Sequence, residues 1–157
     1  MTADNFKHTL EVLNQFGEAI IAEYRAELEA DQNSNGELYR TLSYKVTTVS
    51  GGWTIKLNLA AYWKYLEYGR KPGKMPPVSA IKNWIEVKHI VPRPLQLKPG
   101  KSRVPTINQL SYLIARKIGR DGTKGKHTFE SSFDKVKSAF YTKIEQAIQE
   151  DIKEVLK

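Results

Sequence analysis

The chain has 157 residues, of which 40% are apolar and 27% are charged, and its formal net charge is +8. This length suits one domain, and the apolar content excludes a wholly disordered chain. The sequence contains no cysteine, which excludes disulfides, thiolate nucleophiles and cysteine-based zinc sites. No apolar run reaches the roughly 18 residues of a membrane span, and the first residues do not resemble a signal peptide. We therefore expect a soluble protein that is made in a cytoplasm.

The positive charge is concentrated in the middle of the chain. Residues 64–126 contain fifteen Lys and Arg but only three Asp and Glu, which gives this segment a charge of +12. Residues 1–63 and 127–157 carry charges of −3 and −1. A basic centre between nearly neutral ends predicts one cationic surface, which favours polyanionic partners.

The first predicted element is a long amphipathic helix over residues 6–28. Apolar side chains recur there at steps of three and four, as on one face of a helix. Thr2 or Asp4 would cap its start, and the polar run from Asp31 to Gly36 would end it in a turn. The residues of the apolar stripe are Phe6, Leu10, Leu13, Phe16, Ile20, Tyr24 and Leu28.

A β-hairpin is predicted over residues 43–59. Its first half is rich in β-branched and aromatic residues, and apolar and polar residues alternate from Trp53 to Leu59. The pair Gly51 and Gly52 between the two halves predicts the turn. Because two strands alone are marginally stable, we expect the terminal helices to cover the apolar face of the hairpin.

The middle of the chain predicts two short helices joined by basic loops. Residues 69–77 are too rich in Pro and Gly for regular structure and form the first basic loop. Apolar residues at helical spacing then predict a helix from Val78 to about Lys88. Residues 89–105 contain four prolines and are predicted to be a long loop, which in a small domain usually serves a contact.

The second short helix is expected to begin after Thr106. Thr106 and Gln109 have the spacing of a capping box, and Gly119 would end the helix. Gly122 and Gly125 then mark a further basic loop. The apolar residues of this helix are Ile107, Leu110, Ile114 and Ile118.

A last long helix is predicted over residues 133–155, with Ser131 or Ser132 as its cap. The fold class that follows is α+β, in a single domain over residues 1–157. Its parts are a long N-terminal helix, a β-hairpin or small antiparallel sheet, two short helices with basic loops, and a long C-terminal helix.

Motifs for catalysis, nucleotides or metals are weak in this sequence. The run Gly100-Lys101-Ser102 resembles the end of a phosphate-binding loop, but neither the glycine before it nor the helix after it is present. The three histidines are far apart; His127 and Glu130 could share a helical face, but two ligands do not make a metal site. No pair of carboxylates suggests a general acid and base. We expect no enzyme activity, no cofactor and no metal.

The aromatic segment over residues 62–68 has two interpretations. Aromatic rings interleaved with Lys and Arg can stack on the bases of a nucleic acid. The interpretation that we favour is that they complete the core and a contact between subunits. Glu67 has the wrong charge for a nucleic-acid surface, and a cation in the same chain or on a neighbouring subunit would explain it better.

The loops of the basic segment carry point charges without a recognition helix or zinc module. Such charges suit phosphate contacts that do not depend on base sequence. The alternative is that they are simply solvated. The candidate residues that would face DNA or a partner are Arg70, Lys71, Lys74, Arg93, Lys98, Lys101 and Arg103.

The segment from Tyr62 to Gly73 carries the motif Tyr-x-x-Tyr-x-Glu-x-Gly. It resembles the head-to-tail joining proteins of tailed bacteriophages, also called neck or tail-completion proteins, which often have Glu-aromatic-Gly after a β-hairpin. Versions from phages of Bacteroidetes, the crAss-like group included, are similar also at the Ile-x-x-Trp-Ile helix that begins at Ile81 and at the helix from Leu113 to Gly119. The likeness covers about residues 36–140. It departs at His127-Thr128-Phe129, where many members have Pro-Phe.

This resemblance implies a structural protein of the virion that is assembled in the cytoplasm of the bacterial host. Such proteins form a ring of six or twelve copies between the portal of the head and the tail, and phage DNA passes through the ring. The implied partners are other copies of the chain, portal-side and tail-side virion proteins, and DNA, but no membrane. The motif residues that would lie at the core and subunit boundary are Tyr62, Trp63, Tyr65, Glu67 and Gly69. The alternative is a nucleic-acid-binding module without sequence preference.

Overall fold

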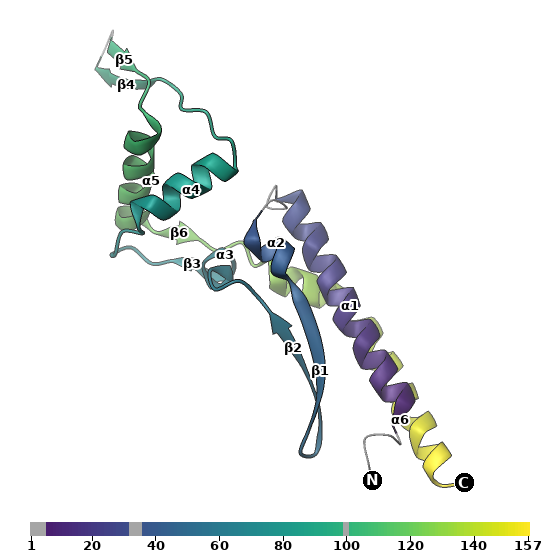
Figure 1. The fold of residues 1–157 in the computed structure, drawn as a ribbon. Helices are drawn as coiled ribbons and strands as arrows, with labels where there is room; N and C mark the ends of the chain where they lie inside the picture. The colour runs from purple at the N-terminus through teal and green to yellow at the C-terminus, as the bar shows by residue number, and fades with distance from the viewer. Residues whose placement is uncertain (1–5, 32–35, 99–100) are drawn as a thin grey trace. The chain divides into compact units, whose positions relative to one another are not determined.

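A computed structural model of the chain describes residues 6–31, 36–98 and 101–157, with the side chains of residues 96–98 and 101 left undescribed (Figure 1). The chain forms two compact units. The terminal unit joins residues 1–63 to residues 127–157, and the central unit is Lys64–Lys126. The single domain expected over residues 1–157 stays a prediction.

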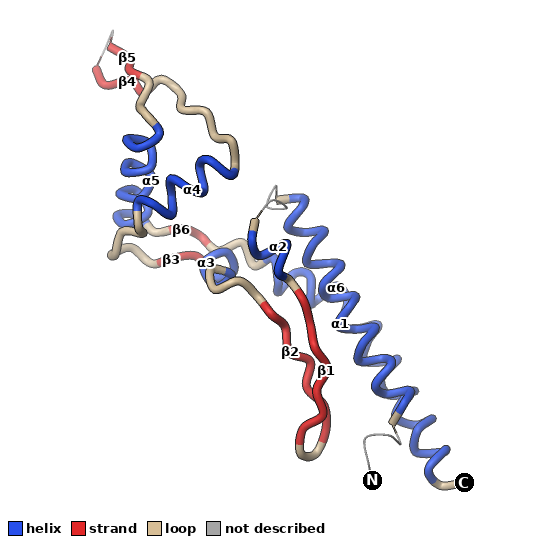
Figure 2. Tube along the Cα trace, in the orientation of Figure 1, coloured by secondary structure: helices blue, strands red, loops and turns tan. Residues whose placement is uncertain are grey.

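The fold is α+β, as the sequence predicts, and Figure 2 marks its helices and strands. The elements of the terminal unit are α1 (Lys7–Ala30), α2 (Glu37–Thr41), β1 (Ser43–Val49), β2 (Gly52–Asn58) and α6 (Thr128–Val155). The central unit contains all of α3 (Trp63–Tyr68) except its first residue, followed by β3 (Gly69–Arg70), α4 (Val78–Val87), β4 (Leu95–Lys98), β5 (Lys101–Arg103), α5 (Ile107–Asp121) and β6 (Thr123–Lys124). None of the described helices is both long enough and apolar enough to cross a lipid bilayer.

The two long helices α1 and α6 lie side by side and form the core of the terminal unit (Figure 1). Phe16 of α1 stacks on Phe140 with ring centroids 3.8 Å apart and meets Phe133 edge-on at 5.9 Å. Each large side chain buried in this way contributes about 1.5–3 kcal/mol. The predicted first helix is confirmed, while its expected caps Thr2 and Asp4 lie outside the described residues. The buried apolar residues of α1 are Leu13, Phe16, Ile20, Ile21, Tyr24 and Leu28.

The predicted hairpin is also confirmed. β1 and β2 pair antiparallel, with Val49 opposite Gly52, so the turn consists of Ser50 and Gly51. The predicted turn at Gly51 and Gly52 is therefore wrong by one residue, because Gly52 belongs to β2. Gly51 has a φ of +86°, a conformation that tight hairpin turns require and glycine adopts without strain. The hairpin packs on α1, where a Cβ on Gly17 would come within 2.3 Å of the Tyr44 ring. Gly17 therefore allows β1 to approach the helix.

The start of α6 differs from the prediction. The helix begins at Thr128, with His127 at the N-cap position in the left-handed conformation. Ser132 is buried inside the helix, where its hydroxyl donates a hydrogen bond to the Thr128 carbonyl at 2.7 Å. The prediction that Ser131 or Ser132 caps this helix is wrong. Phe129 packs edge-on against Tyr24 at 5.4 Å, which gives the additional first turn a hydrophobic contact of its own.

The N-terminal end of α1 is capped by a residue of α6. Phe6 occupies the N-cap position and offers no side-chain hydrogen bond. Instead, the buried Asp151 carboxylate accepts hydrogen bonds from the backbone N–H groups of His8 at 3.0 Å and Thr9 at 2.8 Å, and from the Thr9 hydroxyl at 2.6 Å. Because helix N-termini leave N–H groups unpaired and favour negative charge, this carboxylate ties the two long helices together.

The central unit is built on the packed helices α4 and α5, with Ile85 and Ala115 buried. The predicted capping box at the start of α5 is confirmed: the Gln109 N–H donates to the Thr106 hydroxyl at 3.3 Å, and the Thr106 N–H donates to the Gln109 side chain at 3.1 Å. The prediction that Gly119 ends α5 is wrong. The helix continues to Asp121 and ends at Gly122, which has a φ of +73°.

Three predicted loops contain short strands. Residues 89–105 were expected to be irregular, but β4 and β5 pair there as an antiparallel hairpin. Pro94 lies immediately before β4 and Pro105 lies after β5, so these prolines flank the strands. The loop predicted over residues 69–77 begins with β3, which pairs with β6 in the loop predicted at Gly122 and Gly125. Strands of two to four residues are too short to leave a detectable alternation in the sequence.

Candidate functional site in the central unit

Two segments that are distant in the sequence meet next to the Tyr-x-x-Tyr-x-Glu-x-Gly motif, and we call this pairing the glycine clasp. It consists of residues 66–73 running antiparallel to residues 119–126. Gly69 pairs with Lys124 and Arg70 pairs with Thr123. Backbone hydrogen bonds extend the pairing on both sides, from Lys126 N–H to the Leu66 carbonyl at 2.9 Å and from Gly73 N–H to the Gly119 carbonyl at 2.7 Å.

The glycine clasp requires glycine on both segments. Gly69 has a φ of +73°, and a Cβ there would lie 2.1 Å from the Thr123 carbonyl oxygen. A Cβ on Gly125 would lie 2.2 Å from the Glu67 carbonyl oxygen. Backbone atoms cannot move aside as a flexible side chain can, so any larger residue forces the two segments apart. This close approach explains the glycine of the motif.

The motif residues of α3 divide into two faces. Tyr65 and Tyr68 are 53% and 66% exposed, whereas Glu67 is only 1% exposed. The spacing of three residues places both tyrosines on one side of the helix. Tyr62 lies just before α3, and its hydroxyl accepts a hydrogen bond from the Leu38 N–H at 2.8 Å. Trp63 packs edge-on against Phe129 at 6.3 Å.

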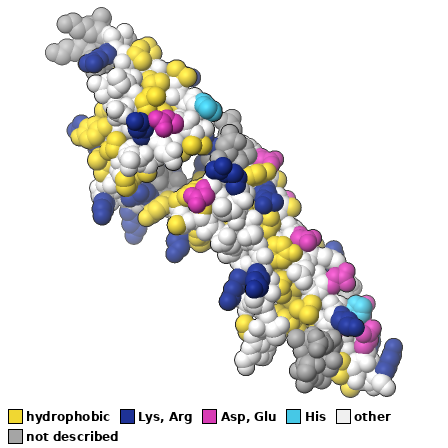
Figure 3. All heavy atoms as spheres, viewed as in Figure 1, with side chains coloured by type: hydrophobic (Ala, Val, Ile, Leu, Met, Phe, Trp, Pro, Cys, Tyr) yellow, Lys and Arg dark blue, Asp and Glu magenta, His cyan; other side chains and the backbone are white. Residues whose placement is uncertain are grey.

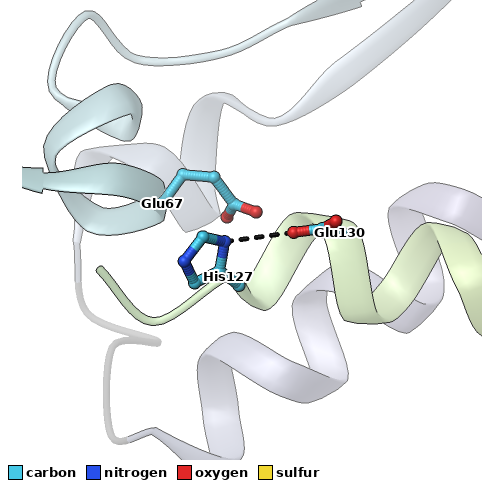
Figure 4. A group of neighbouring side chains, drawn as sticks. All are labelled: Glu67, His127 and Glu130. Carbon is cyan, nitrogen blue, oxygen red and sulfur yellow. Dashed lines mark hydrogen bonds and ion pairs between the residues drawn. The ribbon is translucent and has the colours of Figure 1, made fainter. Parts of the chain in front are cut away.

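The burial of Glu67 bears on the expected cation partner. Glu67 projects from α3 and is almost inaccessible to solvent (Figure 4). A carboxylate is buried only when its charge is compensated, because desolvation of an isolated charge is very costly. A side chain with 1% exposure is a poor candidate for an ion pair with a neighbouring subunit. The expectation that a cation pairs with Glu67 stays a prediction.

The pair that the sequence singled out near the start of α6 is formed. His127 Nδ1 lies 3.0 Å from a carboxylate oxygen of Glu130, and both side chains are exposed (Figure 4). The spacing of three residues at the beginning of the helix brings them together. A glutamate in the first turn also interacts favourably with the positive end of the helix dipole. The contact thus supports the first turn of α6.

The basic residues of the predicted loops come from two separate parts of the central unit. Arg70 lies in the glycine clasp, where its guanidinium carbon sits 4.7 Å from the centre of the Tyr65 ring and its Nη2 donates to the Lys74 carbonyl at 3.4 Å. Lys71 and Lys74 follow it and are exposed. The others belong to the β4–β5 region, where Arg93 and Arg103 are exposed and the side chains of Lys98 and Lys101 lie outside the described residues.

The boundaries of the central unit coincide with those of the basic segment. The unit runs from Lys64 to Lys126 and carries the whole charge of +12, while the terminal unit carries −4. Sequence reasoning identified the basic segment but did not predict that it folds as a compact unit. The change in charge at residues 64 and 126 could have indicated this unit, because the basic segment and the unit begin and end at the same residues.

The central unit also has an apolar groove beside α5, with a volume of about 460 Å³. Tyr112 is 49% exposed at its edge, and Ile107 and Leu113 are exposed on the same helix. Figure 3 shows apolar side chains, in yellow, reaching the surface between basic ones in dark blue. Sequence reasoning assigned this helix no functional role. The residues that line the groove are Leu95, Arg103, Pro105, Asn108, Gln109, Tyr112 and Leu113.

Comparison with protein families, curated proteins and solved structures gives no significant match to this chain. The function therefore has to be argued from the motif of α3 and from the chemistry of the central unit. Two properties of that unit are most informative: its strong positive charge and its exposed apolar side chains.

Proposed function

We propose that this chain is a structural protein of the neck of a tailed bacteriophage. In this role it forms a ring that connects the portal of the head to the tail and surrounds the DNA channel, and it acts without catalysis. The proposal starts from the resemblance of the segment from Tyr62 to Gly73 to the head-to-tail joining proteins. The site of action would be the virion.

The observation that carries the proposal is the combination of charge and apolar surface in one small unit. The central unit has a charge of +12 and exposes the large apolar side chains Leu95, Tyr112 and Leu113, which line the groove beside α5. Exposed apolar groups near one another are typical of surfaces that bind other proteins. A ring repeats the basic surface around its axis, so that a modest charge in each copy becomes a strong field around an anionic duplex.

The groove beside α5 is the strongest candidate for a contact with another protein. Tyr and Arg are enriched in the cores of protein interfaces, and the groove offers both Tyr112 and Arg103 next to Leu113. In a ring, each copy joins its neighbour through two different surfaces. We assign one of these surfaces to the groove beside α5, with portal-side and tail-side proteins as further partners of the neck.

The mass of the assembled protein tests this function. After nuclease treatment, light scattering at several protein concentrations and at low and high salt should give a discrete mass of six or twelve chains. If isolated copies do not associate, the same assembly should form when portal-side and tail-side proteins are added. A protein that stays monomeric in all of these mixtures contradicts the proposal.

Replacing Tyr112 by Asp should prevent the copies from assembling into a ring without unfolding the chain. The residue is 49% exposed, so the variant should stay folded, with a free energy of unfolding lower by about 1–2 kcal/mol. Loss of an interface anchor costs about 2 kcal/mol or more, which weakens association at least about 30-fold. Tyr112→Phe keeps the aromatic surface and should assemble normally. An intact ring in Tyr112→Asp would remove the groove from the interface.

The second candidate function is a nucleic-acid-binding module without sequence preference. It is favoured by the confinement of the +12 charge to one compact unit. If several phosphates are contacted, affinity for duplex DNA should fall by roughly 0.9 log units per contact for each tenfold rise in salt. A monomer that binds DNA in this way would favour this function over the neck. Absence of binding in dilute buffer would eliminate it.

A further inference from the structure

We infer that the exposed face of α3 is a binding platform for single-stranded nucleic acid. Bases would stack on Tyr65 and Tyr68, and phosphates would contact the basic residues beside them. This goes beyond the proposed neck function, which needs only an attraction between positive charge and a DNA duplex. It makes a different demand on the ligand, because the faces of the bases must be free.

The first support is the exposure of the two tyrosines. Tyr65 and Tyr68 are 53% and 66% exposed, so a large part of each side chain faces solvent. Residues three apart on a helix have their Cβ atoms about 5–6 Å from each other, so two adjacent bases could reach both exposed side chains. Stacking of a base on an aromatic side chain is the usual means by which single strands are held, and it contributes about 1–3 kcal/mol per base.

The second support is the cation next to the rings. The Arg70 guanidinium lies 4.7 Å from the centre of the Tyr65 ring, within the range of a cation–π contact. A guanidinium beside exposed rings can stack on a base as well as contact a phosphate. Lys64 and Lys71 are exposed on either side of this stack in the sequence and add positive charge for the backbone of the strand.

The third support is the position of the acidic groups. Glu67 seemed incompatible with a nucleic-acid surface, but its side chain is only 1% exposed, whereas both tyrosines are exposed. Asp121 pairs with Arg120 at 2.6 Å and 2.8 Å. The remaining acidic residue of the central unit, Glu86, lies on α4. The face of α3 that presents Tyr65 and Tyr68 therefore carries no carboxylate of its own.

The fourth support is the glycine clasp, which fixes the end of the platform. Gly69 follows Tyr68 directly and is paired with Lys124, and Arg70 is paired with Thr123. The rings and the guanidinium are thus attached to backbone that is already ordered before a ligand arrives. A preorganised site loses less conformational entropy on binding. In a duplex the base faces are covered by stacking on one another, so the platform favours unpaired bases.

The test compares two fluorescein-labelled probes by fluorescence anisotropy, a 20-nucleotide oligothymidine and a 20-base-pair duplex. The protein should bind the single strand more tightly at the same salt concentration. Tyr65→Ala and Tyr68→Ala should each weaken single-strand binding by about 5-fold to 150-fold, from the stacking energy of one base. Their affinity for the duplex should change less than twofold. Both residues are exposed, so both variants should fold.

Three further variants make the result specific. Tyr65→Phe and Tyr68→Phe retain the ring and should bind oligothymidine like the wild type. Tyr141→Ala removes a tyrosine of similar exposure from α6 and should change neither affinity. Equal binding of both probes, or an unchanged affinity in the double Ala variant, overturns the inference, because binding then depends on charge alone.

The mass of each variant separates this inference from the neck function. If the Ala variants no longer assemble into the multi-copy ring but keep their affinity for oligothymidine, the exposed face of α3 is a contact between copies. The inference is then wrong. If the copies assemble into a ring but the protein does not bind oligothymidine, the inference of a binding platform is wrong and the proposed neck function is still supported. A monomer, with or without virion partners, that binds oligothymidine through Tyr65 and Tyr68 supports the platform and contradicts the neck function.

Discussion

Gly69→Ala is expected to destabilise the central unit by about 2–5 kcal/mol. The left-handed conformation at φ +73° costs an alanine about 1–2 kcal/mol, and relieving a Cβ only 2.1 Å from the Thr123 carbonyl oxygen costs about 1–3 kcal/mol more. Because the obstacle is backbone, the pairing between β3 and β6 should open. Amide hydrogen exchange should be faster at Gly73 and Lys126, whose N–H groups donate hydrogen bonds across the glycine clasp, and thermal unfolding should begin at a lower temperature.

Two other glycines provide controls for this prediction. Gly125→Ala tests the close approach without a left-handed backbone, because its Cβ would lie 2.2 Å from the Glu67 carbonyl oxygen and its φ is not positive. It should open the glycine clasp as well. Gly52→Ala meets nothing within 4 Å and should change stability by less than about 0.5 kcal/mol. Normal exchange at the clasp in Gly69→Ala would contradict the role that we assign to its glycines.

The elements that the sequence predicted well are those with a local signal. The stripe of α1 repeats over six turns, the hairpin alternates with a period of two, and the capping box needs only Thr106 and Gln109. Each of these patterns depends on residues near one another in the chain, so periodicity and spacing are sufficient to detect them.

The glycine clasp could not be predicted in the same way. Gly69 and Gly125 are separated by more than fifty residues, and each alone is typical of an ordinary turn. Gly119 was misread as a helix end for a related reason: a Cβ there would lie 3.0 Å from the Met75 Cα, so its small size serves a contact with a distant segment. A glycine shows that space is needed but not what occupies that space.

The residue types of the candidate site could be predicted from the sequence, but which of its side chains are buried and which are exposed could not. The aromatic segment and its basic neighbours were recognised, but α3 has only six residues and is too short to show a helical period. The sequence therefore could not separate the buried Glu67 from the exposed Tyr65 and Tyr68. That division decides whether the segment can hold a nucleic acid, and it became visible only with the fold.

Asp151→Ala is expected to lower the free energy of unfolding of the terminal unit by about 3 kcal/mol. The buried carboxylate accepts three hydrogen bonds at the start of α1, and hydrogen bonds to charged groups contribute about 1.5–3 kcal/mol each, part of which water restores once the helix end is exposed. Urea denaturation measures the loss. Glu150→Ala removes an exposed neighbouring carboxylate and should cost little. Equal losses in the two variants would contradict the capping role.

The contribution of Asp151 should also depend on pH in a defined direction. Burial by itself would raise the pKa of the Asp151 carboxyl, but hydrogen bonds from the Thr9 hydroxyl and from the N–H groups of Thr9 and His8 outweigh it, so the pKa lies below its ordinary value of 3.8. A carboxyl whose pKa is lowered by folding stabilises the protein above its unfolded pKa and loses that effect as the pH falls through the folded value. The difference between wild type and Asp151→Ala should therefore shrink below about pH 4.

His8 limits the stability of the same helix ends at higher pH. Its side-chain hydrogen bond to Glu154 at 3.3 Å, reinforced by the charges of Glu154, Asp151 and Glu150 against some desolvation, raises its pKa above the ordinary 6.5. A group whose pKa is raised by folding stabilises the fold at pH values below its unfolded pKa. That stabilisation is lost as the pH rises through its folded pKa. The contact between the ends of α1 and α6 should thus be strongest between about pH 4 and pH 6.5, where Asp151 is ionised and His8 is protonated. Urea denaturation should show a different free energy of unfolding for His8→Gln and wild type below pH 6.5, and the two should converge above the raised pKa of His8. A difference that stays constant with pH would show that His8 contributes no charge to this contact.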